Sequence, residues 1–108
     1  MNAELLQYAV RVLAVRAYSE AALERKLLRR GSAAEVEAVL AEVKRMGYLD
    51  DRKYTESYAR LYQGRGGAAK IRRSLKAKGV PERVIDEVLR ALEPEGDPVA
   101  EALALLKR

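Results

Sequence analysis

Apolar residues recur at spacings of three and four along most of the chain, which is the pattern of amphipathic α-helices. Polar and small residues punctuate this pattern at regular places. Ser19 and Ser32 are suited to cap helix starts, and Gly31 is suited to a left-handed position at a helix end. Nowhere do apolar and polar residues alternate as in a half-buried strand. We therefore predict an all-α fold.

The sequence repeats itself at a spacing of 48 residues. The offset pairs these positions: Leu6 with Tyr54, Val10 with Tyr58, Leu13 with Leu61, Leu23 with Ile71, Leu27 with Leu75, Gly31 with Gly79, Val36 with Val84 and Leu40 with Val88. A period of this length indicates tandem supersecondary units. We predict an elongated tandem array of three-helix, helix-turn-helix-like repeats. The repeats are residues 1–48, residues 49–95 and residues 96–108, the last being one helix of an incomplete third repeat.

In the first repeat, we expect a helix over about residues 3–16, whose Leu6, Val10 and Leu13 face inward. Ser19 would cap the second helix. Ser32 and Glu35 form a capping box for the third, which turns Val36, Val39, Leu40 and Val43 inward.

In the second repeat, Asp50 or Asp51 would open a helix that holds Tyr54, Tyr58 and Leu61. Pro81 fits the first turn of the third helix, and a further helix would begin at Asp97-Pro98 and carry Ala102 and Leu106. The inward positions expected on that third helix are Val84, Ile85, Val88 and Leu92.

The chain of 108 residues has no Cys and no His. Zinc sites, iron–sulfur clusters and Cys or His nucleophiles are therefore not expected, and we predict no metal and no cofactor. Arg11 and Arg16 interrupt the apolar N-terminal stretch, so neither a signal sequence nor a membrane span is expected. These features favour a soluble, cytoplasmic protein.

Two short motifs resemble catalytic or ligand sites. The glycines at 64, 66 and 67 precede Lys70, but their spacing and the helical segment before them do not fit a phosphate-binding P-loop, which favours a turn. Asp50-Asp51 is explained by N-capping rather than by a paired-carboxylate site. Because no other catalytic constellation is present, we predict that the protein is not an enzyme.

Positive charge is concentrated in the second repeat. Residues 50–80 hold nine basic and three acidic residues, whereas residues 81–108 hold four and seven. Such clustering favours a polyanionic partner, because neutralising phosphates releases counterions. The candidate contact residues of the second repeat are Arg65, Lys70, Arg72, Arg73, Lys76 and Lys78. A smaller cluster in the first repeat, Arg25, Lys26, Arg29 and Arg30, lies near a helix C-terminus, where a favourable interaction with the helix dipole explains it as well as a binding role does.

The first helix has a second apolar face, formed by Leu5, Tyr8, Val12 and Val15. A partner protein, self-association or inward folding of a neighbouring helix would each cover it. Tyr54, Tyr58 and Tyr62 form one stripe on the corresponding helix of the second repeat. Core packing is favoured for Tyr54 and Tyr58 over stacking on bases, while Tyr62 is the one expected to be partly exposed.

The run Met46-Gly-Tyr-Leu-Asp-Asp51, followed by Tyr54, Ile71-Arg72, Leu75 and Lys78-Gly79, resembles the RecX regulatory proteins. Ser19, Leu23, Lys26-Leu27 and Gly31 are similar to the first unit of that family. The resemblance implies a protein that binds RecA recombinase or the RecA–DNA filament. It also implies inhibition of ATP hydrolysis, strand exchange and co-protease activity in recombination and the SOS response. The sequence departs from the family where a proline is replaced around Gly66-Gly67, and in its single-helix third repeat.

Two other functions stay open from the residues alone. The second helix, a glycine turn and the third helix also resemble a helix-turn-helix, which suggests a sequence-specific DNA-binding module. The acidic third helices argue against it. A helical protein–protein adaptor without nucleic-acid contact would instead use the Leu5, Tyr8, Val12 and Val15 face. In the RecX-like reading, weak non-specific DNA binding would accompany RecA binding.

Overall fold

The structure is a computed structural model that describes residues 1–63 and 67–92. These residues form α-helices joined by short turns, with no strand among them. The helices are α1 (Ala3–Val15), α2 (Glu20–Leu27), α3 (Ala33–Arg45), α4 (Asp51–Tyr62), α5 (Gly67–Ala77) and α6 (Glu82–Leu92). The all-α prediction is confirmed. In this part of the chain, no helix has the length and apolar character that a bilayer span requires.

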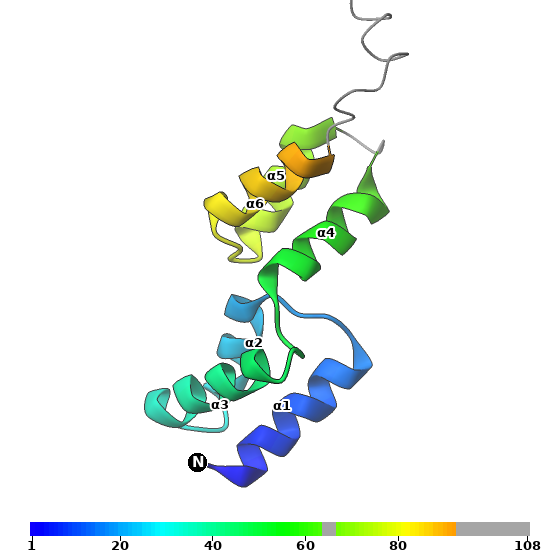
Figure 1. Ribbon diagram of the computed structural model, residues 1–108. Helices are drawn as coiled ribbons and strands as arrows, with labels where there is room; N and C mark the ends of the chain where they lie inside the picture. The colour runs from blue at the N-terminus through cyan, green and yellow to red at the C-terminus, as the bar shows by residue number, and fades with distance from the viewer. Residues whose placement is uncertain (64–66, 93–108) are drawn as a thin grey trace, which may run out of the picture.

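The helices pack as two units of three, α1–α3 and α4–α6, which follow one another along a rod (Figure 1). The principal extents are 59 × 22 × 22 Å, and the radius of gyration is 17.6 Å. A compact domain of similar length has a radius of gyration of about 12 Å. The predicted elongated array of three-helix repeats is therefore confirmed.

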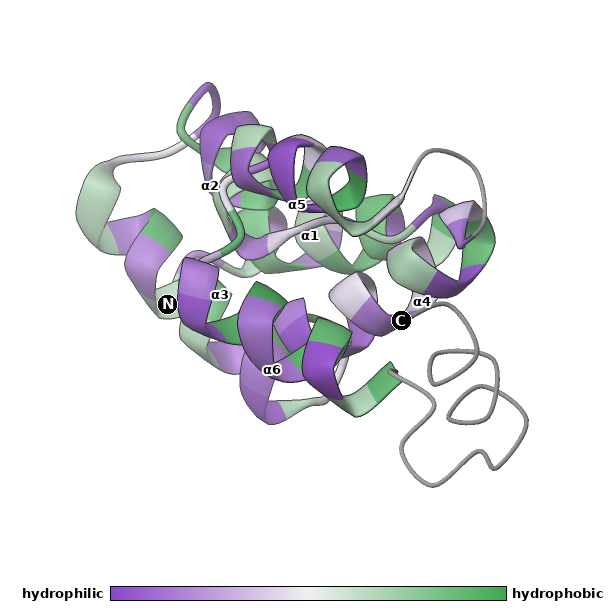
Figure 2. Ribbon diagram, turned by 90° about the horizontal axis from the view of Figure 1, so that it is seen from above, coloured by the Kyte–Doolittle hydropathy of each residue, from purple (hydrophilic) through white to green (hydrophobic). Residues whose placement is uncertain are grey.

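Each unit has its own small core, and the hydrophobic sides of its helices face one another (Figure 2). The predicted inward positions of α3 are all buried. On α6, Ile85 and Val88 are buried, and Val84 and Leu92 are partly buried and pack against the core that contains Ile85. The first core contains Leu5, Ala9, Leu23, Leu27, Val36, Val39, Leu40, Val43 and Leu49, and the second contains Ala59, Ile71, Leu75, Val80 and Ile85.

The helix caps follow the sequence in most places. Ser19 caps α2, and Ser32 with Glu35 forms the predicted capping box of α3. The prediction for Gly31 was wrong, because it is Gly47 and Gly79 that have the positive φ of a helix C′ position, 83° and 82°. Gly31 is needed for space instead, since a Cβ there would lie 2.8 Å from a methyl carbon of Leu5.

The predicted inward faces of the first helices need correction. On α1 the buried residues are Leu5 and Ala9, while Leu6, Val10 and Leu13 are only partly buried. On α4 the buried residues are Thr55 and Ala59. Leu61, which the spacing of 48 pairs with the expected inward position Leu13, is 64% exposed. The buried pairs of α1 and α4 are thus 50 residues apart, so the spacing of 48 does not hold for these helices.

The spacing also changes in the third helices. Val36 and Val39 of α3 take the places of Ile85 and Val88 of α6, which are 49 residues further along. The cause is one additional residue between the glycine and the helix start in the second unit. That residue, Val80, is 3% exposed and belongs to the second core.

The two units are joined where the C-terminal end of α5 meets the N-terminal end of α2. The Ser19 hydroxyl donates to the Lys78 carbonyl oxygen at 2.6 Å. The backbone N–H of Glu20 donates to Asp51 Oδ1 at 2.8 Å. A Cβ at Gly79 would overlap the Cβ of Ala21, so the backbones approach here as closely as glycine allows.

The joint between the two units gives Asp51 a role other than the N-capping predicted from the sequence. Asp50 is the N-cap of α4 and accepts from the backbone N–H groups of Arg52 and Lys53. Asp51 instead reaches across to α2, so N-capping does not explain both. Burial raises the pKa of Asp51, and the hydrogen bond from Glu20 opposes this rise only in part.

Several predictions lie outside the described residues. These are the helix expected from Asp97-Pro98, with Ala102 and Leu106, and the turn residues at 64 and 66. Arg65 of the candidate contact set lies outside them as well.

Candidate interaction surface

Helix α5 holds four of the six contact residues predicted in the second repeat, and its packing decides which of them are available. Ile71 and Leu75 are buried against α4 and α6. Because successive residues of a helix are turned by about 100°, the remaining side chains fall on three sides. One side faces α6, one faces outward and one faces α4.

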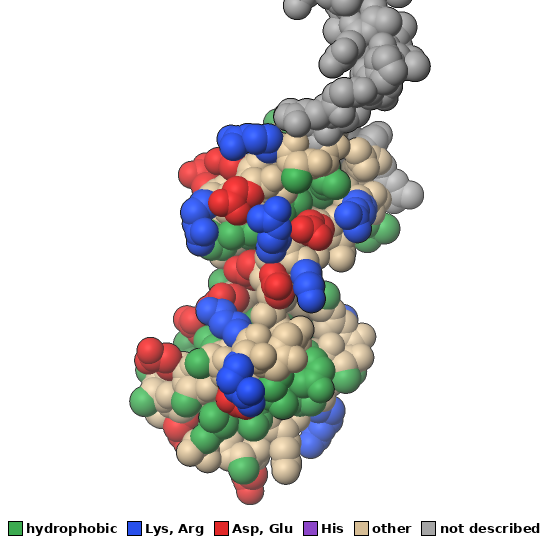
Figure 3. Space-filling view, in the orientation of Figure 1, with side chains coloured by type: hydrophobic (Ala, Val, Ile, Leu, Met, Phe, Trp, Pro, Cys, Tyr) green, Lys and Arg blue, Asp and Glu red, His purple; other side chains and the backbone are tan. Residues whose placement is uncertain are grey.

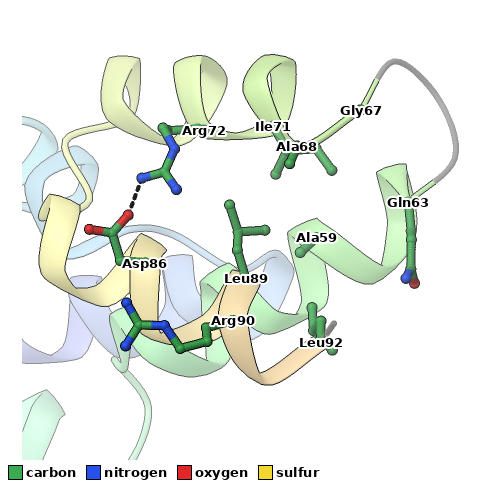
Figure 4. Close-up of a pocket in the computed structure, with 10 residues that line it drawn as sticks. All are labelled: Ala59, Gln63, Gly67, Ala68, Ile71, Arg72, Asp86, Leu89, Arg90 and Leu92. Carbon is green, nitrogen blue, oxygen red and sulfur yellow. Dashed lines mark hydrogen bonds and ion pairs between the residues drawn. The ribbon is translucent and has the colours of Figure 1, made fainter. Parts of the chain in front are cut away.

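The side of α5 that faces α6 is occupied by ion pairs. Arg72 pairs with Asp86, as Figure 4 shows, and the Lys76 Nζ lies 3.1 Å from Glu82 Oε1. The sequence grouped Arg72, Arg73 and Lys76 together as candidate contact residues. In the structure, α6 supplies acidic partners to Arg72 and Lys76.

The other two sides carry basic residues without an acidic partner in residues 1–63 and 67–92. Arg73 and Lys70 are exposed, and Lys78 is half-buried. The Lys78 Nζ lies 5.6 Å from the centroid of the Tyr58 ring, within the range of a cation–π contact. Lys70 lies beside Tyr58 and Tyr62 in a shallow depression between α4 and α5.

The basic cluster of the first unit lies at the other end of α2. Arg25, Arg29 and Arg30 are exposed and Lys26 is half-buried. No ion pair joins these four to an acidic residue of the described chain. The Arg30 Cζ lies 3.8 Å from the centroid of the Tyr8 ring.

The two basic clusters are not continuous. The joint connects Lys78 to Ser19, and α2 carries Glu20 and Glu24 between Ser19 and the basic cluster. Glu20 also pairs with Lys44 of α3 at 2.6 Å. On the face shown in Figure 3, positive and negative side chains are interspersed on the second unit, while hydrophobic ones gather on the first.

A tyrosine beside a basic residue recurs in both units, which the sequence repeat did not reveal. Tyr8 with Arg30 and Tyr58 with Lys78 each join the first helix of a unit to the end of its second helix. The tyrosines are 50 residues apart and the cations 48 apart, so one fixed offset cannot detect both. The only sign of this arrangement in the sequence was the i, i+4 spacing of Tyr54, Tyr58 and Tyr62, which places the three tyrosines on one side of α4.

The apolar face predicted on α1 is largely covered by the first unit itself. Leu5 is 3% exposed, and Tyr8 and Val12 pack against the first core. Only Val15, at 82% exposed, projects into solvent. Leu5 is therefore not available to a partner, because α2 and α3 fold over it near Gly31.

An apolar cavity of about 460 Å³ opens between α4, α5 and α6 at the far end of the second unit. Figure 4 shows Leu89 pointing into it between Ile71 and Ala59, with the Arg72–Asp86 ion pair at its rim. Among its described lining residues, no nucleophile lies beside a base.

Comparisons with known proteins agree with this architecture. A sequence model described as RecX, second three-helix domain, matches residues 50–89. Regulatory protein RecX of Thermus thermophilus is 48% identical over 108 residues, covering 100% of this chain and 72% of that protein. Regulatory protein RecX of Deinococcus radiodurans is 37% identical over 106 residues, covering 96% and 50%.

Two solved structures have a similar fold. The crystal structure of RecX from Lactobacillus salivarius superposes with a TM-score of 0.77 at 19% identity. It covers 82% of this chain, which spans 59% of that one. A crystal structure of regulatory protein RecX gives a TM-score of 0.74 at 28% identity, covering 86% of this chain and 47% of its own. The described helices thus correspond to about half the length of the solved chains.

Proposed function

Because this chain belongs to the RecX family of regulatory proteins, we propose that it binds RecA recombinase or the RecA–DNA filament and inhibits RecA activities. The inhibited activities are ATP hydrolysis, strand exchange and co-protease function. The protein acts by binding and is not an enzyme. The relatives are themselves named regulatory proteins.

One observation supports the contact surface above the others. In the part of the chain that the structure describes, Lys70, Arg73 and Lys78 have no acidic partner, whereas Arg72 and Lys76 are ion-paired within the fold. Paired side chains would have to leave Asp86 and Glu82 before meeting a new anion. The primary contacts therefore come from Lys70 and Arg73 of α5, from Lys78 directly after it, and from the cluster at the C-terminal end of α2, which is Arg25, Lys26, Arg29 and Arg30.

The two alternative functions are less well supported by the geometry. A recognition helix meets DNA phosphates, but α6 displays Glu82, Asp86 and Glu87, each of which engages a basic residue of its own unit. An adaptor that uses the second apolar face of α1 would need Leu5, which is buried.

The test measures inhibition of RecA ATP hydrolysis on single-stranded DNA by the full chain. Arg29→Glu with Arg73→Glu reverses one exposed, unpaired charge in each unit. The control, Arg11→Glu with Arg83→Glu, makes the same change in net charge at exposed residues elsewhere. Surface charge contacts contribute roughly 0.2–1 kcal/mol each and reversal adds repulsion, so we expect about ten-fold weaker inhibition by the test variant only.

Inhibition by the folded test variant equal to that of wild type would remove these side chains from the contact. An absence of inhibition by the wild-type chain at low ionic strength would overturn the proposed function itself.

A further inference from the structure

The surface between α4 and α5 carries a ladder of tyrosines. Tyr54 and Tyr58 have ring centroids 6.4 Å apart, and Tyr58 and Tyr62 have centroids 4.5 Å apart. The first two rings pack on one side against the second core and stay partly exposed on the other. Tyr62 is 37% exposed and ends the ladder. A core role alone does not require the third ring, because it extends beyond the core.

Basic side chains flank this ladder along α5. Lys70 and Ser74 line the depression beside Tyr58 and Tyr62, and Lys78 lies over the ring of Tyr58. Within residues 1–63 and 67–92, neither lysine is paired with an acidic residue. At the other end of the ladder, Asp51 accepts from the backbone N–H of Glu20, and Asp50 accepts from the backbone N–H groups of Arg52 and Lys53. The α4 side of α5 is therefore both aromatic and positively charged.

We propose that this tyrosine–lysine surface, formed by Tyr54, Tyr58, Tyr62, Lys70 and Lys78, binds a single strand of nucleic acid directly. Lys70 and Lys78 contact phosphates, and a base stacks on the exposed ring of Tyr62. Aromatic side chains beside a positively charged groove are the combination that favours unpaired bases, because every base presents a π-face. A duplex could not place a base on Tyr62, because its bases are stacked on one another. An acidic peptide could contact the two lysines but has no base to stack on the tyrosine.

This inference goes beyond the proposed function, because the contact does not require RecA. It shares Lys70 and Lys78 with the contact set proposed above, but not Arg73, which does not line the depression between α4 and α5. The same helix pair in the first unit places Arg30 over Tyr8, which gives a smaller version of the arrangement.

The test uses the full chain and fluorescence anisotropy of a labelled 20-nucleotide oligothymidylate, with a duplex of equal length and a polyglutamate peptide as competitors. Tyr62→Leu keeps an apolar contact with Tyr58 but removes the stacking ring. We expect about a ten-fold loss of affinity for the single strand, the size associated with one stacked base.

Lys70→Gln with Lys78→Gln tests the phosphate contacts. Each phosphate contact on a single strand contributes about 0.7 to the slope of log affinity against log salt concentration, so this slope should fall by about 1.4. Arg11→Gln with Arg83→Gln removes the same charge from exposed sites outside the surface, and should leave the slope within about 0.3 of wild type.

Three results would overturn the inference. The first is that the chain does not bind the single strand at low salt. The second is that duplex and single strand bind with equal affinity and Tyr62→Leu has no effect. The third is that polyglutamate competes as effectively as unlabelled oligothymidylate. Since no RecA is present, none of them affects the role proposed for Arg29 and Arg73.

Discussion

Substituting Gly79 by alanine should reveal how much the joint between the two units contributes to stability. Gly79 has φ of 82°, and a Cβ there would overlap the Cβ of Ala21 in the first unit. The left-handed conformation costs a non-glycine residue roughly 1–2 kcal/mol. Overpacking at a close contact adds about 1–3 kcal/mol. We therefore expect Gly79→Ala to lower the free energy of unfolding by about 2–5 kcal/mol.

The chain offers a matched control for the backbone part of this cost. Gly47 has nearly the same φ, 83°, and also ends a helix, but a Cβ at Gly47 would meet nothing within 4 Å. Gly47→Ala should therefore cost only about 1–2 kcal/mol. The difference between the two variants measures the contact with Ala21. Unfolding by urea, followed by helical circular dichroism, gives both values.

A double-mutant cycle tests whether the contact is the cause. Ala21→Gly removes the overlapping methyl group, at a cost of about 1 kcal/mol in helix propensity. If the overlap is real, Ala21→Gly should recover about 1–3 kcal/mol of the loss caused by Gly79→Ala. Equal destabilisation by Gly47→Ala and Gly79→Ala, or additive effects of Ala21→Gly and Gly79→Ala, would refute the proposed packing of the joint.

Two further predictions follow from the first unit and from α4. The capping-box hydrogen bonds lower the pKa of Glu35 in the folded protein. The ionised Glu35 carboxylate therefore stabilises the fold fully above the ordinary glutamate pKa of about 4.3, and this stabilisation is lost as the pH falls through the lower pKa of the folded state. The stability difference between wild type and Glu35→Gln should shrink over that range, and thermal unfolding at several pH values would contradict this if the difference stayed constant. Leu5→Ala should cost about 2–5 kcal/mol because Leu5 is buried, whereas Leu61→Ala should stay within about 0.5 kcal/mol. Urea unfolding that ranked Leu61→Ala as the more damaging would support the inward face predicted from the sequence.

The local signals in the sequence were sufficient for much of the fold. Ser32 with Glu35, and Ser19 before α2, are caps whose chemistry acts within one turn, so residue type alone identifies them. The apolar periodicity also located all four buried residues of α3. Helix caps and apolar periodicity both depend on residues three or four positions apart in the chain, so they can be recognised from the sequence alone.

The faces of α1 and α4 could not be predicted in the same way. Both helices carry apolar residues on more than one side, so periodicity leaves the rotation about the helix axis open. The buried face is decided by what packs on it. Leu5 is buried because Gly31 leaves room for its methyl groups, and Thr55 and Ala59 are buried because small side chains let α4 approach α6. Leu61 is exposed as a result of the same rotation.

Charge shows the same limit at the candidate site. A count along the sequence treats Arg72, Arg73 and Lys76 as equal members of one cluster, because it contains no information about the neighbouring helix. In the fold, Asp86 and Glu82 of α6 pair with Arg72 and Lys76, so the acidic third helix neutralises one side of the basic second helix. Surface charge available to a partner is therefore set by interhelical pairing rather than by local composition. For this reason an interaction assay should begin with the unpaired residues.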